Sequence, residues 1–78
     1  MNQSTINYFL SRGRDQSHSE TANGCIFERM EEEELVIIVV DPKGIRIDTI
    51  RMSQFAIKSG AAGAVVHKLY EALIKAGR

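Results

Sequence analysis

The period of the apolar positions changes along the chain, beginning with a helical spacing near the N-terminus. Apolar side chains recur there at i, i+3 and i+4, which places them on one face of a short helix. They are Ile6, Phe9 and Leu10. Ser4 or Thr5 is expected to cap this helix at its start, and Gly13 to end it.

Residues 11–24 are polar and rich in Ser, Gln, Asn and Gly, a composition that predicts a flexible loop. An alternative remains open for the end of this segment. Asn23-Gly24 is a typical two-residue turn, and it would join Ser19–Ala22 to Cys25–Met30 as a hairpin. In that case the sheet gains a fourth strand.

The middle of the chain predicts strands. Cys25–Met30 is adequate for one, and Leu35–Val40 is apolar at all six positions, as in a central strand covered on both faces. Asp41–Gly44 has the residue order of a type I turn, with Asp first, Pro second and Gly fourth. Residues 45–49 then alternate. This alternation predicts Ile45, Ile47 and Thr49 on the core face, with Arg46 and Asp48 toward water.

A helical period returns in the last third of the chain. The apolar stripe consists of Ala62, Val65, Val66, Leu69, Leu73 and Ala76. Before the stripe, Ser53 could cap a first turn of helix, and Gly60 would either break the helix or lie within it. Residues 53–76 are therefore expected to form one helix or two.

These elements predict a single α+β domain over residues 1–78. The sheet is antiparallel with three, possibly four, strands, the C-terminal helix covers one face, and the short N-terminal helix lies beside it. A chain of 78 residues buries only about 60% of its unfolded surface, so its core is marginal. Since one helix covers one face of a strand that is apolar on both, we expect the remaining apolar surface to form a homodimer.

Composition argues against catalysis, a metal and a membrane. Cys25, His18 and His67 are the only soft or imidazole ligands, and they have neither the spacing of a zinc site nor that of a catalytic group. We therefore expect no catalytic residues, no cofactor and no small-molecule substrate. The longest apolar run has six residues, whereas a membrane span needs roughly 20. The first residues do not resemble a secretory signal, and we expect a cytoplasmic protein.

Two known motifs, a phosphate loop and a DNA-binding helix-turn-helix, match the sequence only in part, because residues that they require are absent. The small residues of Ser59–Gly63 resemble a phosphate loop, but the Lys-Ser/Thr pair that should follow is missing. Ala56 and Gly60, with Val66 and Leu69, have the packing spacing of a helix-turn-helix. The recognition helix would then begin at residues 61–64, whose side chains cannot hydrogen-bond to base edges.

The zero net charge conceals two oppositely charged parts, because residues 1–34 sum to −4 and residues 35–78 to +4. Within the acidic part, Glu31–Glu34 are four adjacent carboxylates, which repel one another and cannot be buried unpaired. They predict an exposed connection that suits a basic surface. The asymmetry predicts a charged interaction surface, and it would also let two copies of the chain associate head to tail or crosswise.

The order helix, three strands, helix resembles a double-stranded-RNA-binding domain. The resemblance covers the helix at residues 6–10, Ile26-Phe27-Glu28 with the acidic stretch, Leu35–Val40 with the turn after it, and the alanine-rich last helix. It implies RNA contacts from the first helix, from the loop between the first two strands, and from a basic cluster at the start of the last helix, here Lys58 with Lys68 further along. Diverged members that lose RNA contacts serve as protein-interaction and dimerisation modules.

Two functions follow as hypotheses. The first is a non-catalytic regulatory or adaptor protein that binds itself and another protein. Its expected interface residues are Glu31, Glu32, Glu33, Glu34, Tyr70 and Ile74. The alternative is a protein that binds double-stranded RNA or DNA through a basic C-terminal region. Its expected contacts are Arg46, Arg51, Lys58, Lys68 and Lys75.

Overall fold

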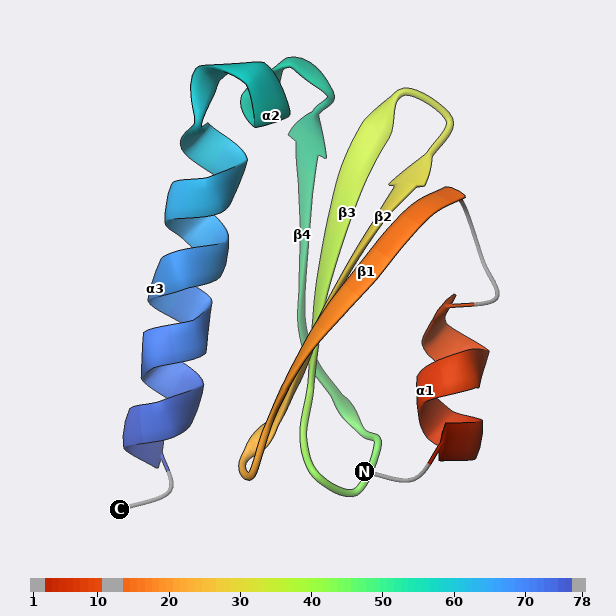
Figure 1. The fold of residues 1–78 in the computed structure, drawn as a ribbon, viewed down its shortest axis with the longest axis vertical. Helices are drawn as coiled ribbons and strands as arrows, with labels where there is room; N and C mark the ends of the chain where they lie inside the picture. The colour runs from red at the N-terminus through yellow and green to blue at the C-terminus, as the bar shows by residue number, and fades with distance from the viewer. Residues whose placement is uncertain (1–2, 11–13, 77–78) are drawn as a thin grey trace.

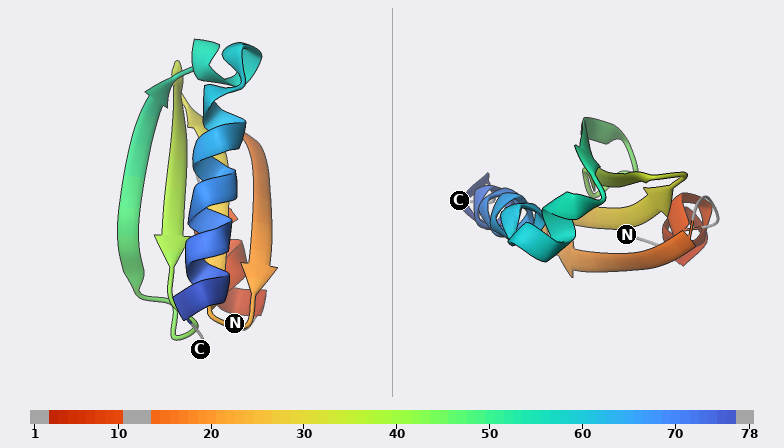
Figure 2. Two further views of the ribbon diagram at one scale, coloured as in Figure 1. Left: turned by 90° about the vertical axis from the view of Figure 1, so that its left-hand side faces the viewer. Right: turned by 90° about the horizontal axis from the view of Figure 1, so that it is seen from above.

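A four-stranded antiparallel sheet lies between helices in the computed structural model, which describes residues 3–10 and 14–76 (Figures 1 and 2). The elements are α1 (Gln3–Leu10), β1 (Arg14–Thr21), β2 (Gly24–Glu31), β3 (Glu34–Val40), β4 (Arg46–Ser53), α2 (Phe55–Ser59) and α3 (Ala61–Ala76). The strands are adjacent in chain order, from β1 at one edge to β4 at the other. The predicted α+β class is confirmed, with the fourth strand present.

The two faces of the sheet are covered by different helices. Side chains alternate between faces along a strand, so β2 and β3 contribute to an apolar cluster on each side. On the face covered by α1, the α1 face, the cluster is Ile6, Phe9, Cys25, Phe27, Val36, Ile38 and Val40. On the face covered by α3, the α3 face, the buried residues are Ile26, Met30, Leu35, Ile37, Val39, Ala62 and Leu73.

The position of α1 corrects the expectation that the two terminal helices lie side by side. Figure 2, seen from above, shows α1 and α3 on opposite sides of the sheet. The reason lies in Leu35–Val40, which is buried at every position. A strand that is apolar on both faces needs cover on both.

The prediction of a loop over residues 11–24 is wrong, because Arg14–Thr21 forms β1 and pairs with β2. A hairpin does join β1 to β2, as the alternative predicted, but its turn residues are Ala22 and Asn23 instead of Asn23 and Gly24, because Thr21 pairs with Gly24. Gly24 has a φ of 146°, and a Cβ there would lie 2.4 Å from the carbonyl oxygen of Val40. Because β1 is a polar edge strand with little apolar alternation, its residues do not indicate a strand over most of their length.

The turn after β3 has the predicted hydrogen bond, in which the Gly44 amide donates to the Asp41 carbonyl at 3.0 Å. The inward positions predicted after it are wrong. Ile45, Ile47 and Thr49 are exposed, as are Arg46 and Asp48. An irregularity between Val39 and Val40 shifts the register of β4, and its half-buried apolar residues are Ile50 and Met52 further along.

The last third of the chain forms two helices. α2 ends at Gly60, which has a φ of 82° in the left-handed region that ends helices, and α3 starts at the next residue. The predicted stripe packs on the sheet through Ala62 and Leu73, with Val65, Val66 and Leu69 partly buried.

Two expectations concern the first helix. α1 begins at Gln3, so Ser4 and Thr5 lie inside its first turn instead of capping it. Gly13 lies outside the described residues. The observed order of elements, with four strands and helices on opposite faces, also differs from the order on which the resemblance to a double-stranded-RNA-binding domain was based. Among the described residues, no helix has the length and apolar character needed to cross a membrane.

Candidate functional site

An apolar groove runs between α3 and the edge strand β4. It has a volume of about 320 Å³ and is lined by Val39, Ile47, Asp48, Leu69, Ala72 and Leu73. The groove exists because α3 lies over the middle of the sheet, and β4 lies clear of it in the face-on view of Figure 2. Ile47 is 55% exposed at this groove. Apolar surface at a sheet edge is typical of a protein-interaction site.

The opposite flank of α3 carries the two helix residues predicted for an interface. Tyr70 is 38% exposed and Ile74 is 45% exposed. Residues seven and four apart lie on one side of a helix, so Gly63, Tyr70 and Ile74 share this flank. Ala72 belongs to the flank that faces the groove. The structure therefore separates Tyr70 and Ile74 from the β4 groove.

The predicted acidic connection is the turn between β2 and β3. Glu32, Glu33 and Glu34 are exposed, which agrees with the prediction from their charge. Glu32 has a φ of 59°, a conformation that non-glycine residues adopt rarely. A glutamate at such a position costs on the order of 1 kcal/mol, and local strain of this kind is concentrated at functional sites.

Glu31 is half-buried and forms ion pairs with two arginines. Its carboxylate lies 2.6 Å from Nε of Arg29 and 3.8 Å from Nη2 of Arg51. Arg29 is only 4% exposed, and its Nη1 donates to the Phe9 carbonyl at 2.6 Å. Glu31 thus neutralises a buried guanidinium that holds the end of α1, and its first role is structural.

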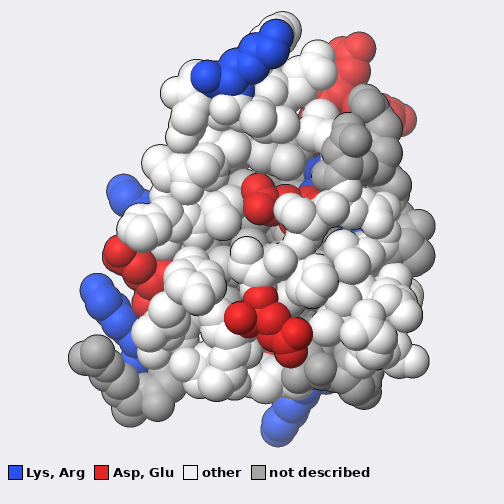
Figure 3. Space-filling model, viewed as in Figure 1, with Lys and Arg blue, Asp and Glu red and all other residues white. Residues whose placement is uncertain are grey.

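The structure does not bring the five predicted phosphate-binding residues together. Lys58, Lys68 and Lys75 are exposed on α2 and α3. Arg46 lies on the other side of the sheet, 5.7 Å from the centre of the Phe9 ring, and Arg51 pairs with Glu31. Figure 3 shows most of the visible Lys and Arg side chains spread around the margins of the face in view, with carboxylates both near its middle and at its margins.

The two histidines lie on opposite sides of the sheet. The His18 ring stacks on Phe27, with centroids 6.0 Å apart, on the α1 face. His67 lies on exposed α3, where Nε2 is 2.8 Å from the Glu71 carboxylate. The described residues contain no group of three or more His, Cys, Asp or Glu that could hold a metal ion.

Cys25 is a buried core residue. Burial and, to a smaller extent, the Glu20 carboxylate raise the pKa of its thiol from an ordinary 9.0 to about 11. The thiol is therefore protonated at neutral pH, and the thiolate is the nucleophilic form. Cys25 therefore acts in the core as a small apolar side chain.

The fold and these surfaces define a small α+β domain with two open sides around one helix. No protein-family model, curated protein or solved structure matches the chain.

Sequence reasoning missed the groove residues Ile47 and Ala72. Alternation assigned Ile47 to the core, and nothing local in the sequence indicates the shift of register in β4. Ala72 is one of several alanines in α3, and only the position of the helix over the sheet shows which alanine lines an opening.

Proposed function

We propose that this chain is a non-catalytic interaction module that forms a homodimer and binds a second protein. The observation that carries the proposal is the groove between β4 and α3, which combines an apolar hollow with the projecting side chain of Ile47. A domain of this size has a marginal core, so apolar surface left open at one edge favours a second chain as its cover.

A two-fold dimer suits this surface because the same patch contains both a projection and a hollow. In such a dimer each copy presents the same residues, so Ile47 of one copy can enter the groove of the other. The outer edge of β4 pairs with no strand among the described residues. An unpaired edge is a common place for strands of two chains to meet.

Binding of another protein is proposed for the acidic turn. Glu32, Glu33 and Glu34 are exposed, and the backbone of Glu32 has a positive φ. Three carboxylates on a tight turn between two buried strands are held in a fixed position, and a basic surface is the complementary partner. This assigns the turn and the groove to different partners.

Analytical ultracentrifugation at micromolar concentration tests the dimer. We expect the unchanged chain to sediment as a dimer and Ile47→Asp to sediment as a monomer, because the variant loses an apolar contact and places a second carboxylate beside Asp48 in the surface that the two copies bury. Ile74→Asp is the matched control on the other flank of α3, and it should remain dimeric. A monomeric unchanged chain contradicts the proposal. Loss of the dimer in Ile74→Asp but not in Ile47→Asp also contradicts it, because the interface would then lie on the flank of α3 that carries Ile74.

A nucleic-acid role is the second candidate, because Lys58, Lys68 and Lys75 are all exposed along α2 and α3. Lysines that neutralise phosphates give binding that weakens steeply as salt rises. Binding of duplex RNA or DNA at low salt, with a steep salt dependence and weaker binding by Lys68→Glu, would favour this candidate over protein binding through the acidic turn.

A further inference from the structure

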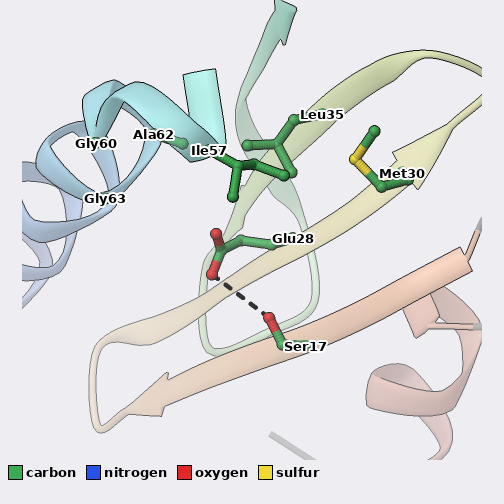
Figure 4. A pocket seen from close by; sticks show the side chains of 8 residues that line it. All are labelled: Ser17, Glu28, Met30, Leu35, Ile57, Gly60, Ala62 and Gly63. Carbon is green, nitrogen blue, oxygen red and sulfur yellow. Dashed lines mark hydrogen bonds between the residues drawn. The ribbon is translucent and has the colours of Figure 1, made fainter. Parts of the chain in front are cut away.

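A second hollow lies where the start of α3 approaches the sheet, on the flank away from the β4 groove. It has a volume of about 530 Å³. Figure 4 shows the eight residues that line it: Ser17, Glu28, Met30, Leu35, Ile57, Gly60, Ala62 and Gly63. Its walls are apolar or small, and Glu28 is the one charged residue among those that line it.

Glu28 occupies an unusual position for a carboxylate. It alternates with Ile26 and Met30 on β2 and so lies on the α3 face, where those two neighbours are buried. The Ser17 hydroxyl donates a hydrogen bond to the Glu28 carboxylate at 3.4 Å. A half-buried carboxylate with one weak hydrogen bond is stabilised by a cation that enters the hollow and donates further hydrogen bonds to it.

Small residues keep the hollow open. A Cβ built at Gly63 meets no atom within 4 Å, and Gly63 has no left-handed backbone that would require glycine. Glycine inside a helix costs about 1 kcal/mol relative to alanine. The local structure therefore gives no reason for glycine at this position, whereas a larger side chain would occupy the hollow.

We propose that this hollow is a socket for a basic side chain, arginine or lysine, of a partner polypeptide. The aliphatic stem lies against Met30, Leu35 and Ile57, and the charged head binds the Glu28 carboxylate beside the Ser17 hydroxyl. An anion is a poor occupant because Glu28 repels it. The inference rests on the proposed role in protein binding, and it assigns the chemistry that the partner must provide.

The surroundings extend the socket into a surface for a peptide. Tyr70 and Ile74 follow Gly63 on the same flank of α3, and both are exposed. Met30 and Leu35 pair with each other across β2 and β3 and flank the acidic turn, one before it and one after it. A matching peptide segment would insert one basic residue into the hollow. Its apolar neighbours would contact Tyr70 and Ile74, and further basic residues would lie near the acidic turn.

The test uses two peptides that differ by one charge. Acetyl-Ala-Leu-Arg-Leu-Ala-amide is titrated into ¹⁵N-labelled protein, and citrulline replaces arginine in the second peptide as its neutral isostere. We expect the Gly60 and Gly63 amide signals to shift with the arginine peptide and the citrulline peptide to bind at least tenfold more weakly. Equal binding of both peptides, or no shift with either, overturns the socket.

Two variants test the socket from the protein side. Glu28→Gln should weaken the arginine peptide about tenfold, and Gly63→Leu should abolish its binding without loss of stability, since no atom opposes the added side chain. Glu71→Gln and Ala64→Leu are the matched controls on exposed positions of α3, and both should bind as the unchanged chain does. Binding retained by Gly63→Leu overturns the proposal.

Sedimentation of the same variants separates this proposal from the proposed function. Glu28→Gln and Gly63→Leu should remain dimeric, because neither residue lines the β4 groove. A dimer that binds no peptide contradicts the socket alone, whereas a monomeric unchanged chain contradicts the homodimer.

Discussion

The two faces of the sheet are closed to different degrees, and helix length does not explain the difference. α1 has 8 residues, and the cluster beneath it is sealed, with every sheet residue in it at most 1% exposed. α3 has 16 residues, yet both hollows open on its face and several apolar residues there are only partly buried. The longer helix covers less completely.

Side-chain size accounts for this contrast. On the α1 face, the Phe9 and Phe27 rings stack with centroids 5.0 Å apart, and large groups such as His18 and Arg46 lie against them. On the α3 face, the helix offers small residues at both openings, Gly63 at one and Ala72 at the other. Aromatic rings fill the space beneath a short helix, whereas small residues leave gaps beneath a long one. The α1 face therefore supplies stability, and the α3 face retains surface for partners.

The largest effect that this contrast predicts is for Phe27→Ala. Removing a fully buried phenylalanine costs about 3 to 5 kcal/mol, which approaches the whole stability of many small domains. We expect the variant to be largely unfolded in urea titrations followed by circular dichroism. Phe55, which is 67% exposed on α2, is the control, and Phe55→Ala should change the free energy of unfolding by less than about 0.5 kcal/mol. Similar losses for both would contradict the contrast between the two faces.

A second effect comes from Cys25 on the sealed face. Its thiol has a pKa of about 11 in the fold against an ordinary 9.0. The folded state thus holds this proton more tightly than the unfolded chain. The contribution of the thiol to the free energy of unfolding is therefore fully present below pH 9 and is lost as the pH rises from about 9 to about 11. The expected loss is on the order of 1 to 2 kcal/mol.

Urea unfolding at pH 8, 9, 10 and 11 measures this loss, and Cys25→Ala separates it from the titration of lysines and tyrosines. The variant should lose less stability than the unchanged chain over the same interval. Parallel curves for the two proteins would show that the thiol titrates alike in the folded and unfolded states.

The sequence predicts some of the elements behind this contrast, but not which surfaces they cover. Leu35–Val40 predicted a central strand that is apolar on both faces, and Ile6, Phe9 and Leu10 predicted a short helix. The partner faces of these elements could not be assigned, because the period of a helix says which side is apolar and not which surface it meets. That missing assignment is why α1 was expected beside α3.

The open face was the less predictable one. Its groove depends on the register shift in β4, and its socket depends on β1, a strand whose polar sequence resembles a loop. Both are edge strands, where backbone pairing forms the strand without a buried alternating pattern. Nothing in the sequence around Glu28 indicates a hollow, and only the position of α3 shows that Glu28 faces one.

The smallest predicted effect concerns the point where the sheet holds the far end of α3. The Asn23 side-chain amide donates to the Leu73 carbonyl at 2.8 Å and lies 3.4 Å from that of Ile74. On the other face, Arg29 holds the Phe9 carbonyl of α1 in the same way, but with a buried charge. A neutral, half-buried amide contributes less, so we expect Asn23→Ala to cost about 1 kcal/mol.

Asn23→Asp distinguishes a specific bond from general packing at this turn. Aspartate keeps the shape of asparagine but loses the amide donor, and its charge faces the negative end of the α3 dipole. We therefore expect it to destabilise the fold at least as much as alanine does, with faster hydrogen exchange in the last turn of α3. Asn7→Ala is the matched control, since that amide bonds only to exposed Gln3 among the contacts described, and it should change stability by less than about 0.5 kcal/mol. If aspartate proves as stable as asparagine, α3 is held by its apolar stripe alone, and the open face lacks the polar anchor that α1 has.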